Sequence, residues 1–395
     1  MTDTIHVGLI GTGFAGEIHA HAYQRVRDID VKLAAVAASS VDGARAFAEE
    51  HNIPAHGTVD DLLARDDLDI VDLCVPNYLH EPLALRAMEG GRHVICEKPL
   101  TGYFGGEEAQ DPVGATPKGL MLEKASASAE RMVEAAREQG VKLMYAENWL
   151  YSPAIDRANR LAGASGGTIL EIRAQECHSG SHAQYAKSWA TSGGGALVRL
   201  ASHPIGATLW LKEKEGLRRN GVPIKATSVL ADVDNLCRVA SLRREAKRHI
   251  VDDWEDVENW SLLVITFDDG TRGVIQGSDI VLGGMEDTLT VLLSNARIDC
   301  DLTHSGLIKA YASHSRVFEE EYIMEKAGTK AGWSYPSVDE EYLLGYPQEI
   351  RDFVESVVHD RSPRSTGRLG LEVVRLMYAA YQSAEEGRPI SLPSS

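Results

Sequence analysis

The chain has 395 residues, more than one hydrophobic core normally holds, so we expect two domains. Its net charge of −18 at pH 7 disfavours nucleic acids and anionic membrane surfaces as partners. No apolar run approaches the roughly 18 residues that span a bilayer. The start of the chain lacks a basic signal-peptide region, and the scattered cysteines have no CxxC spacing. We therefore expect a globular protein of the reducing cytoplasm.

A predicted strand over residues 5–10 leads through a glycine-rich loop into a predicted helix over residues 17–26. The loop has the G-x-G-x-x-G pattern, which indicates dinucleotide binding when it joins a strand to a helix. The first glycine permits the tight turn, the second lets the backbone approach a pyrophosphate, and the third allows close helix packing. We expect the whole loop to contact the cofactor, namely Gly11, Thr12, Gly13, Phe14, Ala15 and Gly16.

The end of the second predicted strand, over residues 31–37, bears on the choice of cofactor. An acid at this position bonds the ribose 2′-hydroxyl of NAD, whereas an arginine accommodates the 2′-phosphate of NADP. The tip carries neither, so we expect NAD and count Ser39 and Ser40 among its contacts. Arg45, one helical turn further, leaves NADP open. A helix over residues 42–51 follows, with Asp42 as its expected N-cap.

Further strands over residues 69–77 and 94–100, with a helix over 83–89 between them, continue the alternation. This pattern predicts the α/β class, with a doubly wound parallel sheet in a domain over residues 1–150. Ligands bind at the carboxyl ends of such strands. We therefore assign the residues at these ends to cofactor binding: Pro76, Asn77, His80, Glu97, Lys98 and Asn148. For His80, a capping or surface role is the alternative, and for Glu97 a structural ion pair.

Lys98 stands out because an apolar strand delivers a charged pair to its carboxyl end. Charged side chains are rarely buried unless they are paired. We interpret Lys98 as a catalytic acid/base, and a surface lysine in a turn is the alternative. The glycine-rich stretch 101–119, which leaves directly from this strand, predicts a lid or a subunit-contact arm rather than a passive linker.

The glycine loop, Val-Pro-Asn-x-x-His at 75–80 and Glu-Lys-Pro-Leu at 97–100 resemble the Gfo/Idh/MocA family over nearly the whole chain. The resemblance implies a Rossmann domain, a second domain with a large open mixed sheet, and NAD(P)-linked redox chemistry on sugars and polyols. It also implies that Lys98 lies at the active site. A family segment, Gly-Gly-Gly-x-Leu-x-Asp-x-Gly-x-His, matches residues 193–203 here, except that Arg199 replaces Asp and Ala201 replaces Gly.

This segment supplies a second catalytic candidate, His203, since the family histidine assists at the substrate hydroxyl; a buried structural histidine is the alternative. Arg199 lies one helical turn earlier, so we expect both side chains on one face. An arginine suits a carboxylate, sulfonate or phosphate. Together with Arg173 and Lys187 it suggests an anionic sugar, and an ion pair with a protein carboxylate is the open alternative.

The second domain is predicted to span residues 151–395, with an α+β architecture, strands between residues 169 and 293, and terminal helices packed on its body. In the family the sheet of this domain is commonly the dimerisation surface, which implies a homodimer or homotetramer. Additional substrate contacts are expected from Trp149, Tyr151, His178 and His182. For Trp149 and Tyr151 the alternative is interdomain packing, and for His178 and His182 it is a solvated position in a loop. We expect no metal, because the two histidines lack a carboxylate partner of clear spacing.

Three functions remain open from the sequence. The first is NAD-dependent oxidation of a ring secondary hydroxyl in a sugar or glycoside. The second is an NAD-dependent glycosidase that oxidises C3 transiently, eliminates the aglycone and reduces the sugar again, for example on a sulfoquinovoside or a uronic-acid glycoside. The third is a non-catalytic protein that senses NAD or sugar.

Overall fold

The structure is a computed structural model that describes residues 4–303, 307–327 and 329–393. Two compact units divide the described chain. Unit 1 comprises Met1–Gly102, Glu123–Tyr151 and Gly345–Val374, and unit 2 comprises Tyr103–Leu122, Ser152–Leu344 and Arg375–Ser395.

Two segments cross the division that was predicted at residues 150 and 151. The stretch predicted as a lid on the first domain belongs to unit 2, where the backbone N–H of Tyr103 donates to the hydroxyl of Tyr378. The segment Gly345–Val374 belongs to unit 1, where the backbone N–H of Tyr145 donates to the carbonyl of Ser365. Both crossings depend on partners that are distant in sequence.

Unit 1 contains a six-stranded sheet with the order β3-β2-β1-β4-β5-β6, and all of its strand pairs are parallel. This confirms the doubly wound α/β prediction. The strands are β1 (Ile5–Ile10), β2 (Val31–Ala37), β3 (His56–Gly57), β4 (Ile70–Leu73), β5 (His93–Glu97) and β6 (Leu143–Ala146).

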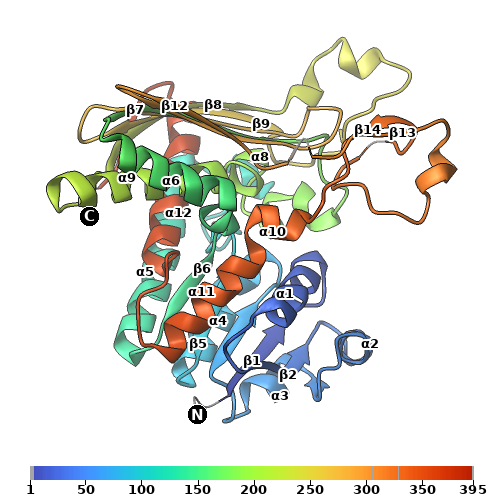
Figure 1. The fold of residues 1–395 in the computed structure, drawn as a ribbon. Helices are drawn as coiled ribbons and strands as arrows, with labels where there is room; N and C mark the ends of the chain where they lie inside the picture. The colour runs from blue at the N-terminus through green and yellow to red at the C-terminus, as the bar shows by residue number, and fades with distance from the viewer. Residues whose placement is uncertain (1–3, 304–306, 328, 394–395) are drawn as a thin grey trace. The chain divides into compact units, whose positions relative to one another are not determined.

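The helices of unit 1 cover this sheet, and Figure 1 shows α1 beside α11. The elements are α1 (Phe14–Arg25), α2 (Val41–His51), α3 (Val59–Leu63), α4 (His80–Glu89), α11 (Tyr346–Val358), and the 3₁₀ turns η1 (Asn77–Leu79) and η3 (Asn148–Tyr151). Helices α5 (Lys118–Gln139) and α12 (Gly367–Glu386) contribute residues to both units.

The predicted N-cap of α2 is wrong. Ser40 caps this helix, because its hydroxyl accepts a hydrogen bond from the backbone N–H of Gly43. Asp42 lies inside the first turn, where a carboxylate still favours the helix dipole.

Unit 2 contains a seven-stranded mixed sheet with the order β12-β11-β7-β10-β9-β8-β15. Only β7 and β10 pair in parallel, which confirms the predicted mixed sheet. The strands are β7 (Ile169–Cys177), β8 (Ala226–Asp234), β9 (Trp260–Phe267), β10 (Arg272–Ser278), β11 (Glu286–Leu293), β12 (Arg297–Asp301) and β15 (Ile390–Ser391), with a separate hairpin of β13 (Ala310–Ala312) and β14 (Gly332–Ser334).

Helices α6 and α9 lie against one face of this sheet (Figure 1). The remaining elements are α6 (Pro153–Ser165), α7 (Trp189–Ser192), α8 (Ala196–Arg199), α9 (Ser202–Asn220), α10 (Glu340–Leu344), η2 (Val113–Ala115), η4 (Gln184–Lys187), η5 (Leu236–Arg238), η6 (Leu242–Arg244) and η7 (Ser315–Phe318). No helix within the described part of the chain is long and apolar enough to cross a bilayer.

Candidate active site

The loop between β1 and α1 has the geometry that its glycines predict. Gly11 adopts a φ of +111°, and a Cβ there would lie 2.0 Å from the carbonyl oxygen of Cys74. A Cβ on Gly16 would lie 2.3 Å from the carbonyl oxygen of Gly11, so helix α1 can approach the loop only at a glycine. A Cβ on Gly13 would meet no protein atom within 4 Å. Packing therefore explains the outer two glycines but not Gly13.

This loop also leaves the start of α1 suited to a phosphate group. Gly13 is the N-cap of the helix and provides no side-chain cap. The first N–H groups of a helix have no partner within the helix and favour an anion. These features fit the pyrophosphate of a dinucleotide. Thr12, Phe14 and Ala15 lie in the same loop and first turn, and the Phe14 side chain is exposed.

The end of β2 offers hydroxyl groups rather than a cation. Ser39 is exposed, and the Ser40 hydroxyl is already engaged in capping α2. The guanidinium of Arg45 lies 3.2 Å from the carboxylate of Asp42. Arg45 therefore pairs with a carboxylate of the protein. This arrangement fits NAD, which has no 2′-phosphate for an arginine to bind.

The carboxyl ends of β4 and β5 bring together Pro76, Asn77, His80, Glu97 and Lys98. His80 is fully buried, with Nδ1 2.8 Å from the carbonyl oxygen of Pro99 and Nε2 2.9 Å from that of Val75. Burial lowers the pKa of this imidazole, although both carbonyl groups oppose the shift. Both ring nitrogens thus contact the backbone, so His80 positions the turn that carries Lys98 rather than presenting a nitrogen to the cofactor.

Lys98 is surrounded by carboxyl groups of unit 1. The Glu97 side chain accepts the backbone N–H of Lys98 at 2.8 Å. Burial works to raise the pKa of Glu97, but the hydrogen bond and charge of His19, and then the charge of Lys98, bring it below the usual value. Burial raises the pKa of Glu147 well above its usual value, and the charge of Lys98 opposes this rise. Lys98 therefore lies close to two carboxyl groups whose pKa values are shifted in opposite directions.

The turn after β6 is buried. Asn148, Trp149 and Tyr151 are each at most 3% exposed. The Tyr151 hydroxyl donates to the Asp352 carboxylate at 2.8 Å and accepts from the backbone N–H of Ser365 at 3.0 Å. These contacts lie within unit 1 and occupy the hydroxyl. They support a packing role for Tyr151, the alternative to a substrate contact.

In unit 2 the three glycines that precede α8 pack against buried polar groups. The Glu258 carboxylate accepts the backbone N–H of Gly195 at 3.0 Å and of Leu197 at 2.9 Å, and the Tyr381 hydroxyl at 2.8 Å. Burial raises the pKa of Glu258, and these donors oppose the rise. A Cβ on Gly195 would lie 1.8 Å from the carbonyl oxygen of Glu258. The glycines are therefore needed for this packing, and Glu258 is the anchor of the segment.

The expectation that Arg199 and His203 share one helical face is wrong. Arg199 ends α8 and His203 lies in the first turn of α9, with Leu200 and Ala201 between the two helices. The break packs on β10, because a Cβ on Gly277 would lie 3.0 Å from both the Cβ and the nitrogen of Ala201. The two side chains consequently have different partners.

Arg199 forms an ion pair with Asp279, a fully buried residue directly after β10. The guanidinium also stacks over Trp254 at 4.8 Å from the ring centre. His178 lies 3.5 Å from the other Asp279 oxygen. Burial raises the pKa of Asp279, and Arg199 opposes the rise. The ion pair with a protein carboxylate, which the sequence left open, is thus present.

His203 lies with its Nε2 4.0 Å from the carboxylate of Glu176 on β7. Both residues are buried, and Asp287 on β11 pairs with Glu176 in the sheet register. Burial raises the pKa of Asp287 well above its usual value, and the charge of Glu176 adds to the rise. His203 is therefore placed beside a carboxylate, as expected of a histidine that exchanges a proton.

The other predicted substrate contacts of unit 2 are dispersed. Lys187 is buried and pairs with Asp253, whereas His182 is exposed in the preceding loop. Arg173 lies on the exposed face of β7 and pairs with Glu171. Because side chains alternate along a strand, Arg173 points away from the face that carries Glu176. The structure therefore does not support grouping Arg173 with His203.

We predict that Arg199→Met destabilises the protein by about 3–5 kcal/mol, because it leaves the buried Asp279 without its cation. The double variant Arg199→Met/Asp279→Leu should recover most of that loss, since it removes both charges. Urea unfolding of the two variants and the wild-type protein measures the difference. Equal stability of the single variant and the wild type would show that the pair contributes nothing.

Several buried residues near the candidate sites were missed from the sequence. They are His19, Asp72, Glu147 and Glu349 in unit 1, and Glu176, Glu258 and Asp279 in unit 2. Asp72 offered one signal, because it is a lone acid inside the apolar strand Ile70–Leu73. The others became visible only through their partners in the fold.

Two family models match this chain. "Oxidoreductase family, NAD-binding Rossmann fold" matches residues 5–116, and "Oxidoreductase family, C-terminal alpha/beta domain" matches residues 164–392. The chain belongs to the Gfo/Idh/MocA family. As a member, it has an NAD-binding Rossmann unit, and the glycine loop is where the cofactor's pyrophosphate fits.

Several relatives of this chain are named as dehydrogenases of sugars or polyols. The chain is 22% identical to myo-inositol 2-dehydrogenase of Thermotoga maritima, over 98% of each chain. It is 29% identical to levoglucosan dehydrogenase of Pseudarthrobacter phenanthrenivorans, but this alignment spans only 52% of the chain and 51% of the relative. Among solved structures, GenD2 from gentamicin A biosynthesis, in complex with NAD, matches with a TM-score of 0.80 and 26% identity over 100% of this chain and 98% of that one.

Proposed function

We propose that this protein is an NAD-dependent dehydrogenase that oxidises a secondary hydroxyl of an uncharged sugar, polyol or glycoside. The observation that carries the proposal is Lys98, which follows β5 at the carboxyl edge of an NAD-binding sheet, among Glu97 and Glu147. Relatives that are named as inositol and levoglucosan dehydrogenases support the substrate class.

The chemistry divides between the cofactor and the side chains. NAD, when bound, supplies the hydride acceptor. Lys98 takes the proton of the hydroxyl that is oxidised, and Glu97 holds the backbone N–H of this lysine in place. His203, beside Glu176, is the second candidate for contact with the substrate hydroxyl.

Paired cations favour an uncharged substrate. Arg199, Lys187 and Arg173, the residues that suggested an anionic sugar, each form an ion pair with a carboxylate of unit 2. At Arg199 a substrate anion would have to displace Asp279 from a buried pair, which is costly to break. The other two pairs each include an exposed side chain and oppose an anion less. A hydroxyl-rich neutral ring needs only hydrogen-bond partners.

The test is a screen of inositols, hexoses, pentoses and alkyl glycosides next to uronic acids and sulfonated sugars, with NAD and NADP in parallel. We expect NADH to accumulate with a neutral compound and NAD. Release of an aglycone without net NADH, together with deuterium at C2 in D₂O, would instead indicate the redox-neutral glycosidase. Tight binding of NAD with no turnover of any compound would indicate a sensing protein.

We further predict that His203→Asn lowers kcat on the order of 10²-fold, because it removes the imidazole proposed to assist at the substrate hydroxyl while keeping a polar side chain of similar reach. The affinity for NAD should stay unchanged. Steady-state kinetics with the best compound of the screen, together with calorimetric titration of NAD, measure both quantities. Unchanged kcat would remove His203 from the catalytic set.

A further inference from the structure

A row of buried side chains crosses unit 1 next to Lys98. His19 and Tyr23 lie one helical turn apart on α1. Asp72 of β4 accepts from the Tyr23 hydroxyl at 2.9 Å and lies 2.9 Å from Nδ1 of His19. The other ring nitrogen of His19 lies 3.3 Å from the Glu97 carboxylate. The row therefore reads Glu97, His19, Asp72, Tyr23: hydrogen bonds join the last three, and a 3.3 Å ion-pair contact joins His19 to Glu97.

The sheet geometry places this row on a single face. Asp72 pairs with Ile95 in the register of β4 and β5, and Glu97 follows two residues later on β5. Since side chains alternate along a strand, Asp72 and Glu97 project from the same face, the one that α1 covers. Helix α1 runs from the carboxyl edge of the sheet back to the amino edge. The row thus starts at Lys98 and leads away from the cofactor edge.

The charges along the row suit proton transfer. Burial alone would lower the pKa of His19. The charges and hydrogen bonds of Asp72 and Cys74 outweigh burial, so the pKa lies well above the usual value. Burial raises the pKa of Tyr23, and Asp72 adds to the rise. Glu349 of α11 faces the same cluster, and burial raises its pKa well above the usual value against the charge of His19. A ring that accepts a proton at one nitrogen and then releases the proton of the other carries a proton across the side chain, and the raised pKa of His19 stabilises the doubly protonated ring between these two steps.

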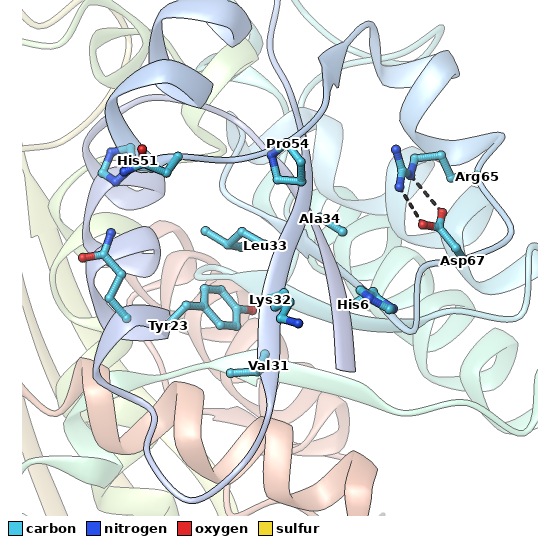
Figure 2. Close-up of a pocket in the computed structure, with 12 residues that line it drawn as sticks. His6, Tyr23, Val31, Lys32, Leu33, Ala34, His51, Pro54, Arg65 and Asp67 are labelled. Atoms are coloured by element: carbon cyan, nitrogen blue, oxygen red, sulfur yellow. Dashed lines mark hydrogen bonds and ion pairs between the residues drawn. The ribbon is translucent and has the colours of Figure 1, made fainter. Parts of the chain in front are cut away.

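The far end of the row reaches a cavity. Tyr23 lines a space of about 410 Å³ beside the amino-terminal ends of β1 and β2, together with His6, Leu33 and His51. Figure 2 shows Tyr23 facing the strand that carries Val31 to Ala34 across this space. The strand ends place the cavity at the edge of the sheet opposite to the glycine loop and Lys98.

We propose that Glu97, His19, Asp72 and Tyr23 form a proton path that connects Lys98 with the cavity at the amino edge of the sheet. The inference rests on the proposed function of Lys98. Oxidation of one hydroxyl releases a hydride, which leaves on the cofactor, and one proton, which the Lys98 amine takes up. Lys98 passes this proton through the Glu97 carboxylate to Nε2 of His19. The ring, now protonated on both nitrogens, gives its Nδ1 proton to Asp72. Asp72 gives a proton to the phenol oxygen of Tyr23 as the Tyr23 hydroxyl releases its own proton to solvent. The other side chains regain their starting states, and return of the remaining ring proton from Nε2 to Nδ1 resets His19 for the next turnover.

Tyr23→Phe tests the path because it removes only the terminal hydroxyl. A single turnover in weak buffer with a pH-indicator dye follows NADH formation and proton release at the same time. In the wild-type protein the two should coincide, whereas in Tyr23→Phe proton release and kcat should fall roughly tenfold, with the KM for NAD unchanged. Added imidazole, a small proton carrier, should restore kcat. A merely structural hydroxyl would not produce a lag that imidazole abolishes.

Tyr145→Phe is the matched control. It also removes a buried hydroxyl of unit 1, but Tyr145 pairs with Cys96 in the register and so lies on the opposite face from Glu97. Proton release should keep pace with NADH formation in this variant. A lag of equal size in both variants, or a lag in neither, would overturn the path.

A second measurement needs no substrate. Infrared spectra after transfer into D₂O follow exchange of the protonated carboxyl groups, and Glu349→Gln identifies the contribution of Glu349. We expect slower exchange in Tyr23→Phe than in Tyr145→Phe, and equal rates would overturn the path. Slower exchange in a protein that forms no NADH with any alcohol would reject the dehydrogenase proposal and leave the path standing.

Discussion

Replacement of Lys98 by alanine is expected to lower kcat by roughly 10²–10⁴-fold, the usual contribution of a positioned general acid or base. The amine is the group of unit 1 that lies at the carboxyl end of β5 next to Glu97 and Glu147, so no neighbour offers the same chemistry. The neighbouring carboxylate of Glu97, whose pKa lies below the usual value, is a weaker base than an amine. Steady-state assays with the substrate from the screen measure the loss.

Lys32→Ala is the matched control for that variant. Lys32 lies on β2 with a side chain that is 63% exposed and pairs with Asp30. Its loss should change kcat less than twofold, as expected of an exposed pair. Binding of NAD to Lys98→Ala, followed by calorimetry, separates lost chemistry from lost cofactor. A fall in kcat well short of tenfold would contradict the assignment of Lys98.

Substitution of Gly13 and of Gly11 by alanine should have opposite consequences. Gly11→Ala would place a Cβ 2.0 Å from the Cys74 carbonyl at a φ of +111°, so we expect a loss of stability of about 1–3 kcal/mol or more. Gly13 has a φ of −91°, and a Cβ there meets no protein atom within 4 Å. Gly13→Ala should keep the stability and weaken NAD binding roughly tenfold, because the methyl group occupies the approach of the pyrophosphate.

Urea unfolding without cofactor and calorimetric titration of NAD distinguish the two variants. The wild-type protein and Gly13→Ala should unfold at the same urea concentration. If Gly13→Ala bound NAD as tightly as the wild-type protein, the assignment of the pyrophosphate to this loop would be wrong. If Gly11→Ala were fully stable, the close approach to Cys74 would carry no energetic weight.

Much of the fold followed from local patterns. Strands over residues 5–10 and 31–37 were predicted with the bounds that the structure has, because apolar β-formers ended at turn residues there. The glycine loop identified its own conformation, since only glycine tolerates the φ of Gly11 and the contact at Gly16. The parallel direction of the strands in the first sheet followed from the alternation of strands and helices.

Local patterns failed where a neighbour was distant in sequence. The four-residue spacing of Arg199 and His203 suggested one helical face. In the structure α8 ends at Arg199 and α9 begins at Ser202, and the break between them packs on Gly277. Arg199 looked available to a substrate anion, but its partner Asp279 follows β10, 80 residues further along the chain. Asp42 looked like a cap, but the helix begins at Val41, so the N-cap position falls on Ser40.

By itself, the sequence determined the dinucleotide-binding sheet and the position of Lys98 at a strand end, because periodicity and turn chemistry act over a few residues. The mixed character of the second sheet followed from the resemblance to the family. Only the tertiary structure decided which charges are compensated. Glu349 from the end of the chain faces His19 from its beginning, and Asp72 lies between them in sequence. The energy of a buried charge depends on its partners in space, and no local pattern contains them.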